Sequence, residues 1–444
     1  MITDIELTLI REALDFAQNS GAQKASATLS VSSEDLVATL NGEIDRITRC
    51  QDRSLSLCLF VDGRFGSFST NKLDKDALHD FILKAIETVR MLAEDPCRDL
   101  AAPERTCKTA LRGDELGAVD PARADITPET RLQAALDASV FATPTPKEYE
   151  IISEEGEYSD SICEVVLMDT NGLFCRQTET SFDYGVEITI EADGEKYSGY
   201  AWDSWSRFAD LDSAACGRTA LERAVAQIGS GPARSGKYTM VLDRECASRA
   251  ISPVLRALSG YSIQQNNSFL MDSIGKKIFP DGLTVLDDPH IQGNVCSKLF
   301  DSEGTATTPH AIIKGGVVKE YFINTFIGNK LGMSPTVEDP VRPHVLPYPQ
   351  AGLDRDAILK MCGDGILVTD FNGGNSNPAT GDFSYGIEGF LFKDGRIVRP
   401  VSEMLVTGNF LTLWQGFKAS GSDARQCMSK LVPTLAFENV DFSG

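Results

Sequence analysis

The sequence predicts an α+β protein built from two domains. Its 444 residues exceed the ~250–300 at which a single hydrophobic core stops growing. The first hundred residues follow the order helix, strands, helix, which is typical of helices that cover one face of an antiparallel sheet. The second half is β-rich, and its hairpin signals favour a mainly antiparallel sheet. Hydrophobic residues make up 42% of the chain and charged residues 24%, as is usual for globular proteins.

The first hundred residues contain two expected helices and two expected strands. A capping box of Thr3 and Glu6 begins the first helix, and Gly21 ends it. Its apolar face consists of Leu7, Ile10, Leu14 and Ala17. Strand alternation appears at Ala25, Ala27, Leu29 and Val31, and again at Leu55, Leu57, Leu59 and Val61. The second strand runs into Asp62-Gly63, a type I′ hairpin signal.

A second helix begins at its expected cap, Asp74. Its apolar face consists of Leu78, Phe81, Ile82, Ala85, Val89 and Leu92. Residues 98–127 are rich in Ala, Pro and charge, as in a linker or a mobile loop. A further helix is expected at Asp212–Ile228, and the Gly- and Ser-rich stretch after it suggests a boundary. We therefore expect an N-terminal α+β domain over residues 1–230 and a C-terminal β-rich domain over residues 231–444.

The C-terminal half shows strand patterns around two short turns. Gly315-Gly316 and Asp394-Gly395 are both two-residue hairpin signals. One helix is expected at Cys246–Leu258. The stretch Asn372–Gly381 is rich in Gly, Asn and Pro and is too long for a tight turn, so we expect an ordered or functional loop there.

The charge of the chain limits its partners. A net charge of -22, without any basic block, argues against binding to nucleic acid or to an anionic membrane. The first residues show no signal-peptide pattern, and no apolar run approaches the ~20 residues of a membrane span. Eleven cysteines stand singly, without a CxxC pair. This pattern favours reduced thiols and a cytoplasmic location.

Several motifs in the chain resemble catalytic signatures without matching them. Gly231–Lys237 fits the spacing of a phosphate-binding loop, but a helix precedes it, a strand follows it, and Tyr238 replaces the required Ser or Thr. We interpret it as a linker. The segment around Ser384 has the wrong spacing for a GxSxG elbow, no Cys–His pair is evident, and GxGxxG is absent.

Metal binding would need converging ligands. The four histidines are His79, His290, His310 and His344, and none belongs to an HxxxH or HExxH pair. His79 is interpreted as a surface residue of the second helix. Folding could bring His290, His310, Asp301 and Glu303 together as a metal site. The alternative is that they are turn caps and solvated charges.

An ordered series of segments in the C-terminal half resembles the TldD/PmbA family. These proteins were once named modulators of DNA gyrase and are now regarded as metallopeptidases. The order and spacing of the segments match over about 200 residues of this chain. The segments are Ser268–Met271, Ile278–His290, Phe300–Thr305, Asn377–Ser384 and Pro400–Asn409.

The resemblance distinguishes two branches of that family. TldD-type chains carry a helix with HExxxH, which supplies two zinc-ligating histidines and a general base, and a ligating Cys near the C-terminus. The corresponding helix here is Ala250–Ser259, which has neither His nor Glu, and its Ser, Pro and Arg cannot replace those ligands. Counting along the chain puts the Cys position near Ala419, so Cys427 is expected to be structural. The resemblance therefore implies a chain of the PmbA branch, also called TldE, with no catalytic residue and no metal of its own.

In that family the zinc-less chain pairs with a zinc-holding TldD-type chain, and the heterodimer acts on unfolded or leader peptides. A homodimer is possible when the chain is alone. We expect an extended peptide to add to strand edges and to glycine-rich backbone. The expected peptide-binding residues are Asn372, Gly373, Gly374, Asn375, Asn377, Thr380 and Gly381.

Two other functions are compatible with the sequence. In the first, His290, Asp301, Glu303 and His310 bind a metal in a stand-alone peptidase. In the second, the chain is a non-enzymatic protein that regulates gyrase or a toxin–antitoxin pair. Its acidic charge permits contact with a basic protein surface but not with DNA.

Overall fold

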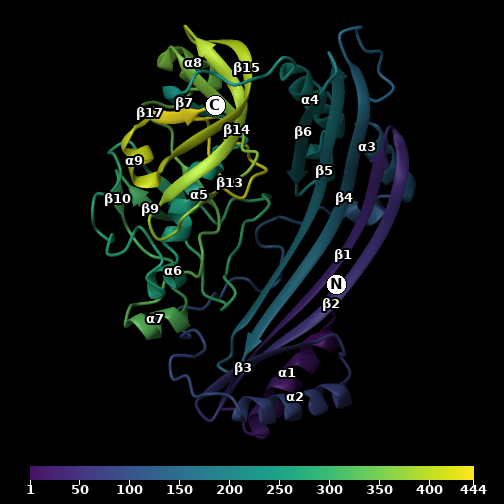
Figure 1. Ribbon diagram of the computed structural model, residues 1–444. Coiled ribbons are helices and arrows are strands. Elements are labelled where there is room, and N and C mark those ends of the chain that lie inside the picture. Colours follow the sequence, from purple (N-terminus) through teal and green to yellow (C-terminus); the bar gives the residue numbers. More distant parts are fainter.

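The computed structural model describes residues 1–444 as two lobes that face each other across a cleft (Figure 1). The N-terminal lobe is one large, curved antiparallel sheet with helices on one face. The C-terminal lobe is a small barrel surrounded by loops and short helices. The α+β class is therefore confirmed. No helix has the length and apolar character needed to cross a membrane.

The N-terminal sheet has six strands in the order β3-β2-β1-β4-β5-β6, and all neighbours are antiparallel. Four of these strands are 17 to 20 residues long, which makes the sheet tall and strongly curved. The strands are β1 (Lys24–Leu40), β2 (Glu43–Val61), β3 (Arg64–Thr70), β4 (Glu150–Asp169), β5 (Phe174–Ala192) and β6 (Glu195–Trp205).

Four helices cover one face of this sheet. The helices are α1 (Asp4–Asn19), α2 (Lys75–Arg90), α3 (Pro128–Leu136) and α4 (Ser213–Ala226). The capping box of Thr3 and Glu6 is present, and the Asp74 carboxylate accepts a hydrogen bond from the Ala77 amide, so both predicted helix starts are confirmed. Alternate residues of β1, such as Leu29 and Val37, pack under the helices in two separate clusters.

A buried ion network anchors α3 to the sheet. The Asp160 side chain has no exposed surface and accepts hydrogen bonds from Arg131 at 2.5 and 3.0 Å. Arg123 lies 2.9 Å from the same carboxylate and comes from the short 3₁₀ helix η1 (Pro121–Asp125). Asp35 on β1 lies within 3.7 Å of both arginines. Because each charge has an opposite partner, the network is tolerated in the interior.

The C-terminal lobe closes on itself through its strand pairing. The ring runs β12-β7-β17-β15-β14 and returns to β12 by an additional β12–β14 pairing, so five strands form a barrel. All pairings are antiparallel except the one between β7 and β12. The barrel strands are β7 (Gly236–Leu242), β12 (Gly365–Asp370), β14 (Asp382–Lys393), β15 (Arg396–Asn409) and β17 (Leu435–Ser443).

Two strands attach to this barrel without joining its ring. β16 (Phe417–Ser420) pairs with β17, and β13 (Gly374–Ser376) pairs with β14 and has no neighbour on its other side. A separate sheet has the order β10-β9-β8-β11. Its strands are β8 (Val285–Asp287), β9 (His310–Lys314), β10 (Val317–Val318) and β11 (Pro343–Val345).

One core of 43 buried residues fills the C-terminal lobe. Trp414 is fully buried near its centre and packs edge-to-face against Phe437. The helices of this lobe are α5 (Ser248–Ala257), α6 (Gly260–Gln264), α7 (Thr325–Leu331), α8 (Arg355–Cys362) and α9 (Phe410–Gln415). The predicted helix at Cys246–Leu258 is therefore confirmed, as is the one at Asp212–Ile228.

The three predicted hairpin turns are present. Each joins two antiparallel strands, and both turn residues have positive φ, as a type I′ turn requires. The turn residues are Asp62-Gly63, Gly315-Gly316 and Asp394-Gly395. The strand β7 begins at Gly236, within the segment Gly231–Lys237, and no helix follows there as a phosphate-binding loop would require.

Residues 98–127, predicted as a linker or mobile loop, contain no long element but are well packed. Cys107 and Ala110 are buried. Thr106 forms a β-bridge with Thr305 of the C-terminal lobe, and Gly113 forms one with Gln177 of β5. The segment therefore joins the two lobes through specific contacts that its composition did not predict.

Candidate peptide-binding cleft

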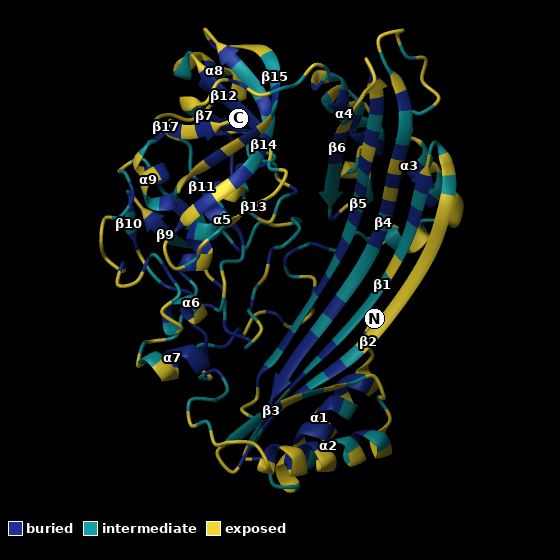
Figure 2. Ribbon diagram, viewed as in Figure 1, coloured by how far each residue is buried: buried dark blue, intermediate teal, exposed yellow.

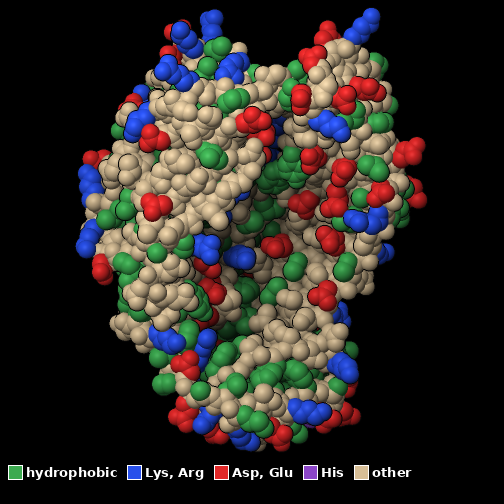
Figure 3. Space-filling view, viewed as in Figure 1, with side chains coloured by type: hydrophobic (Ala, Val, Ile, Leu, Met, Phe, Trp, Pro, Cys, Tyr) green, Lys and Arg blue, Asp and Glu red, His purple; other side chains and the backbone are tan.

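The cleft lies between the helix-free face of the large sheet and the C-terminal lobe (Figure 3). Its deepest part is a cavity of about 550 Å³. Strands β4, β5 and β6 form one wall, and residues 295–302, 338–341 and 427–429 form the other. A cavity of this volume can hold several residues of an extended peptide or a small ligand.

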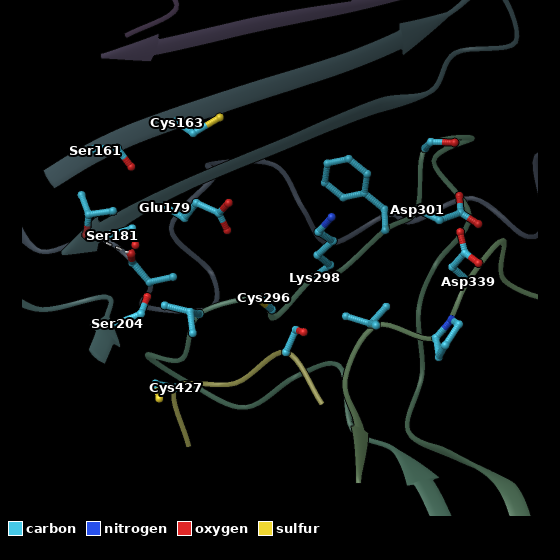
Figure 4. Close-up of a pocket in the computed structure, with 18 of the residues that line it drawn as sticks. Ser161, Cys163, Glu179, Ser181, Ser204, Cys296, Lys298, Asp301, Asp339 and Cys427 are labelled. Carbon is cyan, nitrogen blue, oxygen red and sulfur yellow. Dashed lines mark hydrogen bonds between the residues drawn. The ribbon is translucent and has the colours of Figure 1, made fainter. Parts of the chain in front are cut away.

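Strand register explains why the sheet wall of the cleft is polar. Side chains alternate between the two faces of a strand. Asp160 and Glu164 on β4 point under the helices and are buried, so Ser161 and Cys163 point into the cleft (Figure 4). Their cross-strand neighbours Ser181 and Glu179 lie on the same face. The sheet thus presents hydroxyl, thiol and carboxylate groups to the cavity.

None of the five charged side chains that line the cavity has an ion-pair partner in the chain. Three of them are Glu179 on β5 and Lys298 and Asp339 on the opposite wall (Figure 4). Burial and the negative charge of Glu338 raise the pKa of Asp339. Because the chain leaves these charges uncompensated, they are available to the polar groups of a ligand.

The structure gives each candidate metal ligand a separate hydrogen-bonding role. His290 Nε2 lies 2.9 Å from the Thr307 hydroxyl. His310 Nε2 lies 2.5 Å from Glu320 on the other side of its own hairpin. Asp301 accepts hydrogen bonds from the amides of Glu303 and Thr305, as the cap of a tight turn.

Glu303 completes this set by accepting hydrogen bonds from the amide and hydroxyl of Thr325 at the start of α7. Burial raises the pKa of both Asp301 and Glu303. No three His, Cys, Asp or Glu side chains of the chain lie together as a metal site. The geometry therefore gives no support to a metal centre of these four residues.

The helix where the resemblance places the zinc ligands is packed with apolar side chains. Ala250, Ile251 and Val254 of α5 are 3%, 0% and 0% exposed and belong to the main core of the lobe. The Ala250 carbonyl accepts a hydrogen bond from Trp414 Nε1. Pro253 lies inside the helix. These three residues offer no ligand atom to a cation. Ser252 and Pro253 of the same helix are half-buried, and Arg256 is exposed.

The two positions considered for a ligating Cys lie in different surroundings. Ala419 packs with α8 residues in a second, smaller core and does not belong to the cluster that contains α5. Ala419 and the buried residues of α5 therefore pack in different hydrophobic clusters. Cys427 is 5% exposed and lines the cavity, where burial raises the pKa of its thiol.

The predicted peptide-binding loop lies at the surface and includes β13. Asn372, Gly373, Gly374 and Asn375 are exposed. Asn377 and Thr380 fold the rest into a compact turn, in which the Asn377 carbonyl accepts a hydrogen bond from the Gly381 amide and the Thr380 hydroxyl donates one to Asp382. Unlike the others, Gly381 is buried, where it contacts Phe269 and cannot meet a peptide directly.

Two arginines that sequence reasoning missed hold the cavity together. Arg342 is fully buried, and its guanidinium donates to the carbonyls of Val295 and Gln426. Arg425 reaches across the cleft to β6, where it donates to the Trp202 carbonyl and pairs with Asp203 at 3.2 Å. Neither residue belongs to a local motif, so only their distant partners reveal their role.

The chain thus has two lobes with a cavity of about 550 Å³ between them, and it has no group of three His, Cys, Asp or Glu side chains that could hold a metal. Three family models match this chain: domain 1 of the PmbA/TldA metallopeptidases over residues 25–89, the central domain over 122–228 and the C-terminal domain over 235–444. The chain belongs to the PmbA/TldD family.

Individual relatives support this assignment over the full length of the chain. The metalloprotease PmbA of Escherichia coli O157:H7 is 27% identical over 435 residues, which cover 96% of this chain and 94% of that protein. A TldD homologue of Buchnera aphidicola is 22% identical over 63% of this chain and 62% of that protein.

Solved structures show the same fold. A Bacteroides thetaiotaomicron protein proposed to modulate DNA gyrase has 38% identity and a TM-score of 0.95, with both chains covered completely. TldE of Thermococcus kodakarensis has 17% identity and a TM-score of 0.85, with 98% of this chain and 100% of that chain covered.

Proposed function

We propose that this chain is the zinc-less TldE/PmbA-type subunit of a cytosolic metallopeptidase that processes unfolded or leader peptides. The carrying observation is the composition of α5, where Ser252, Pro253 and Arg256 cannot replace the zinc ligands and general base that the resemblance implies, while Ala250, Ile251 and Val254 pack into the core. Zinc would then be supplied by a TldD-type partner. The role of this chain is to complete a chamber and to hold the extended peptide.

The free edge of β13 supports a peptide-holding role. The Gly386 amide donates to the Gly373 carbonyl, and the Asn377 amide donates to the Asp382 carbonyl, so odd-numbered residues of this segment bond to β14. In an antiparallel pair the intervening residues turn their N–H and C=O groups away from the neighbour. The backbone groups of Gly374 and Ser376 therefore face the free edge, where an extended peptide can add as a further strand.

Co-expression with a TldD-type chain that contains HExxxH tests the proposal. We expect a stable complex of the two chains, with zinc bound in the TldD-type chain and peptidase activity on unfolded peptides well above that of either chain alone. Size-exclusion chromatography, metal analysis and peptide cleavage give the three readouts. If the two chains form no complex and activity does not rise, the proposal is wrong.

A variant of β13 tests the peptide edge within that complex. Ser376→Pro removes an outward amide that the fold does not use, so we expect an intact complex with a severalfold higher KM for peptides. Ser384→Ala, on the exposed face of β14, is the matched control and should leave KM unchanged. An unaltered KM in Ser376→Pro would exclude this edge as the peptide site.

The Bacteroides relative described as a gyrase modulator supplies a second candidate function. A pull-down of gyrase by this chain, without any TldD-type chain present, would favour a non-enzymatic regulator. The stand-alone peptidase requires bound metal and activity in the purified chain. Near-zero metal content together with no cleavage would dismiss it.

A further inference from the structure

Two cysteines meet in the interior where the two lobes join. Cys107 belongs to residues 98–127, which we call the connecting segment, and Cys175 lies near the start of β5. They are 3% and 0% exposed, and Figure 2 shows β4 and β5 as mostly buried where β5 begins. The Cys175 thiol donates to the Cys107 carbonyl at 3.6 Å and also forms a hydrogen bond with the Cys107 sulfur. Two thiols in such contact need only a rotamer change to form a disulfide.

This contact makes the two thiols unequal in acidity. The hydrogen bond from Cys175 outweighs burial and holds the pKa of Cys107 well below its usual range. The same hydrogen bond, together with burial, raises the pKa of Cys175. Because the thiolate is the form that reacts with oxidants, Cys107 is the thiol that reacts first and Cys175 is its resolving neighbour.

Cys107 lies where the connecting segment touches both lobes. Its amide donates to the Gly304 carbonyl of the C-terminal lobe at 2.8 Å. On the other side, the Arg176 amide of β5 donates to the Ala110 carbonyl of the connecting segment at 2.8 Å. Phe300, which lines the cleft cavity, packs in the same buried cluster as both cysteines. A covalent bond between the two sulfurs would therefore join the connecting segment to the sheet beside the cavity.

We propose that Cys107 and Cys175 are a redox-active dithiol, which hydrogen peroxide converts into an intramolecular disulfide that limits movement of the lobes about the cleft. The Cys107 thiolate attacks one peroxide oxygen and becomes a sulfenic acid, while the other oxygen leaves and is protonated to water. The Cys175 sulfur then attacks the Cys107 sulfur, and the sulfenic oxygen leaves with the Cys175 proton as a second water. The two electrons of the new disulfide's thiols reduce the peroxide O–O bond.

The inference does not rest on the proposed function, because its test needs neither a zinc-holding partner nor peptidase activity. The two cysteines are 68 positions apart in the sequence. A crosslink that closes so long a loop restricts the unfolded chain more than the folded one, so it should raise the Tm. It should also slow opening of the connecting segment, because that segment would then be covalently bound to β5.

The test treats the full-length chain with hydrogen peroxide. All eleven cysteines are free thiols, and Cys50 is exposed, so Cys50→Ser serves as the parent to suppress crosslinks between molecules. We expect the thiol count in denaturant to fall by two and peptide mass mapping to find the bond between Cys107 and Cys175. The Tm should rise by several degrees, and hydrogen exchange of the connecting segment should slow severalfold. Dithiothreitol should reverse all four changes.

Two further variants in that parent separate the chemistry from the packing. Cys175→Ser keeps a hydroxyl that can donate to Cys107 but cannot resolve a sulfenic acid. We expect it to leave a dimedone-reactive sulfenic acid at Cys107, with no rise in Tm. Cys163→Ser is the matched control, because this thiol lines the cavity and is not part of the pair, so the disulfide should form as in the parent.

Three results would overturn the inference. The first is an unchanged thiol count after peroxide treatment, which would make the pair an inert part of the core. The second is a disulfide between other cysteines, such as Cys296 and Cys427 of the cavity wall. The third is a bond between Cys107 and Cys175 that leaves hydrogen exchange of the connecting segment unchanged. If Cys175→Ser fails to fold, the thiol count and mass map of the parent still decide.

Discussion

The edges of the two larger sheets of this molecule differ. The C-terminal sheet closes into a ring through the β12–β14 pairing and leaves only two short appended strands, β13 and β16. The N-terminal sheet stays open, with β2 exposed along nine consecutive residues. Closure removes pairing groups from solvent, whereas an open sheet offers them to another chain. We therefore expect stability to depend on the barrel and association to depend on the open sheet.

The hydrophobic cores of the two lobes also differ. The barrel lobe has one cluster of 43 buried residues, whereas the sheet packs its helices through separate clusters of 21 and 14. A single large cluster spreads a local defect through many contacts. Between its two clusters the sheet relies on the buried charges of Asp160, Arg123 and Arg131.

Truncation of the barrel centre should have the largest effect. Trp414 has no exposed surface, and Trp414→Ala should lower the free energy of unfolding by about 3–5 kcal/mol through lost burial and a residual cavity. Ile47→Ala on the open edge should change it by less than ~0.5 kcal/mol. Denaturant unfolding of the two variants measures both values. A comparable loss in both would refute the contrast between the closed and open sheets.

Breaking the buried ion network should lower the free energy of unfolding nearly as much as Trp414→Ala does. Asp160→Ala leaves the two arginines with only the more distant Asp35 and should destabilise the protein by about 3 kcal/mol. Asp99→Ala, which removes a surface ion pair with Lys24, should cost less than ~1 kcal/mol. Hydrogen exchange should show faster opening of α3 in the first variant alone. Equal protection of α3 in both would argue that the network is not its anchor.

Local patterns predicted most elements of the fold. The capping box of Thr3 and Glu6 and the three hairpin turns all depend on residues close together in sequence, so the sequence identified them correctly. Barrel closure could not be predicted, because it depends on β7 and β12 meeting across more than a hundred residues. The length of the sheet strands was also missed, since buried polar residues on the helix-covered face, such as Asp160, Glu164 and Thr180, interrupt the apolar alternation.

The candidate site was harder to predict than the fold. Glu179 and Lys298 come from separate lobes, and no spacing rule connects them. The loop at Asn372–Gly381 was identified through its glycines and asparagines, but its strand pairing with β14 was not. Proximity of His310 to Asp301 and Glu303 in sequence suggested a cluster that the hairpin and turn geometry keeps apart.

A smaller loss of stability is expected from a change at Arg425, where the two lobes meet. Arg425 pairs with Glu245 at 2.7 Å and with Asp203 of β6, and Arg425→Ala should lower the free energy of unfolding by about 1.5 kcal/mol. The neighbouring Arg244 is more exposed and lies farther from the same Glu245, at 3.8 Å. Arg244→Ala is therefore the matched control and should leave the free energy of unfolding nearly unchanged. Small-angle scattering should show a wider cleft only in Arg425→Ala. An unchanged profile would mean that Arg425 does not hold the lobes together.

The smallest effect should appear as a pH dependence at His310. Burial opposes the charged form, but the hydrogen bond and charge of Glu320 outweigh it and raise the pKa of His310 above its ordinary value. A raised pKa in the folded state adds stability below the unfolded value of ~6.5, and that stability is lost as pH rises through the folded value. The difference in unfolding free energy between the wild type and His310→Gln should therefore be largest at acidic pH, below ~1 kcal/mol, and vanish in alkaline buffer. Glu320→Gln should show the same trend, and a difference that grows with pH would reverse the assigned sign.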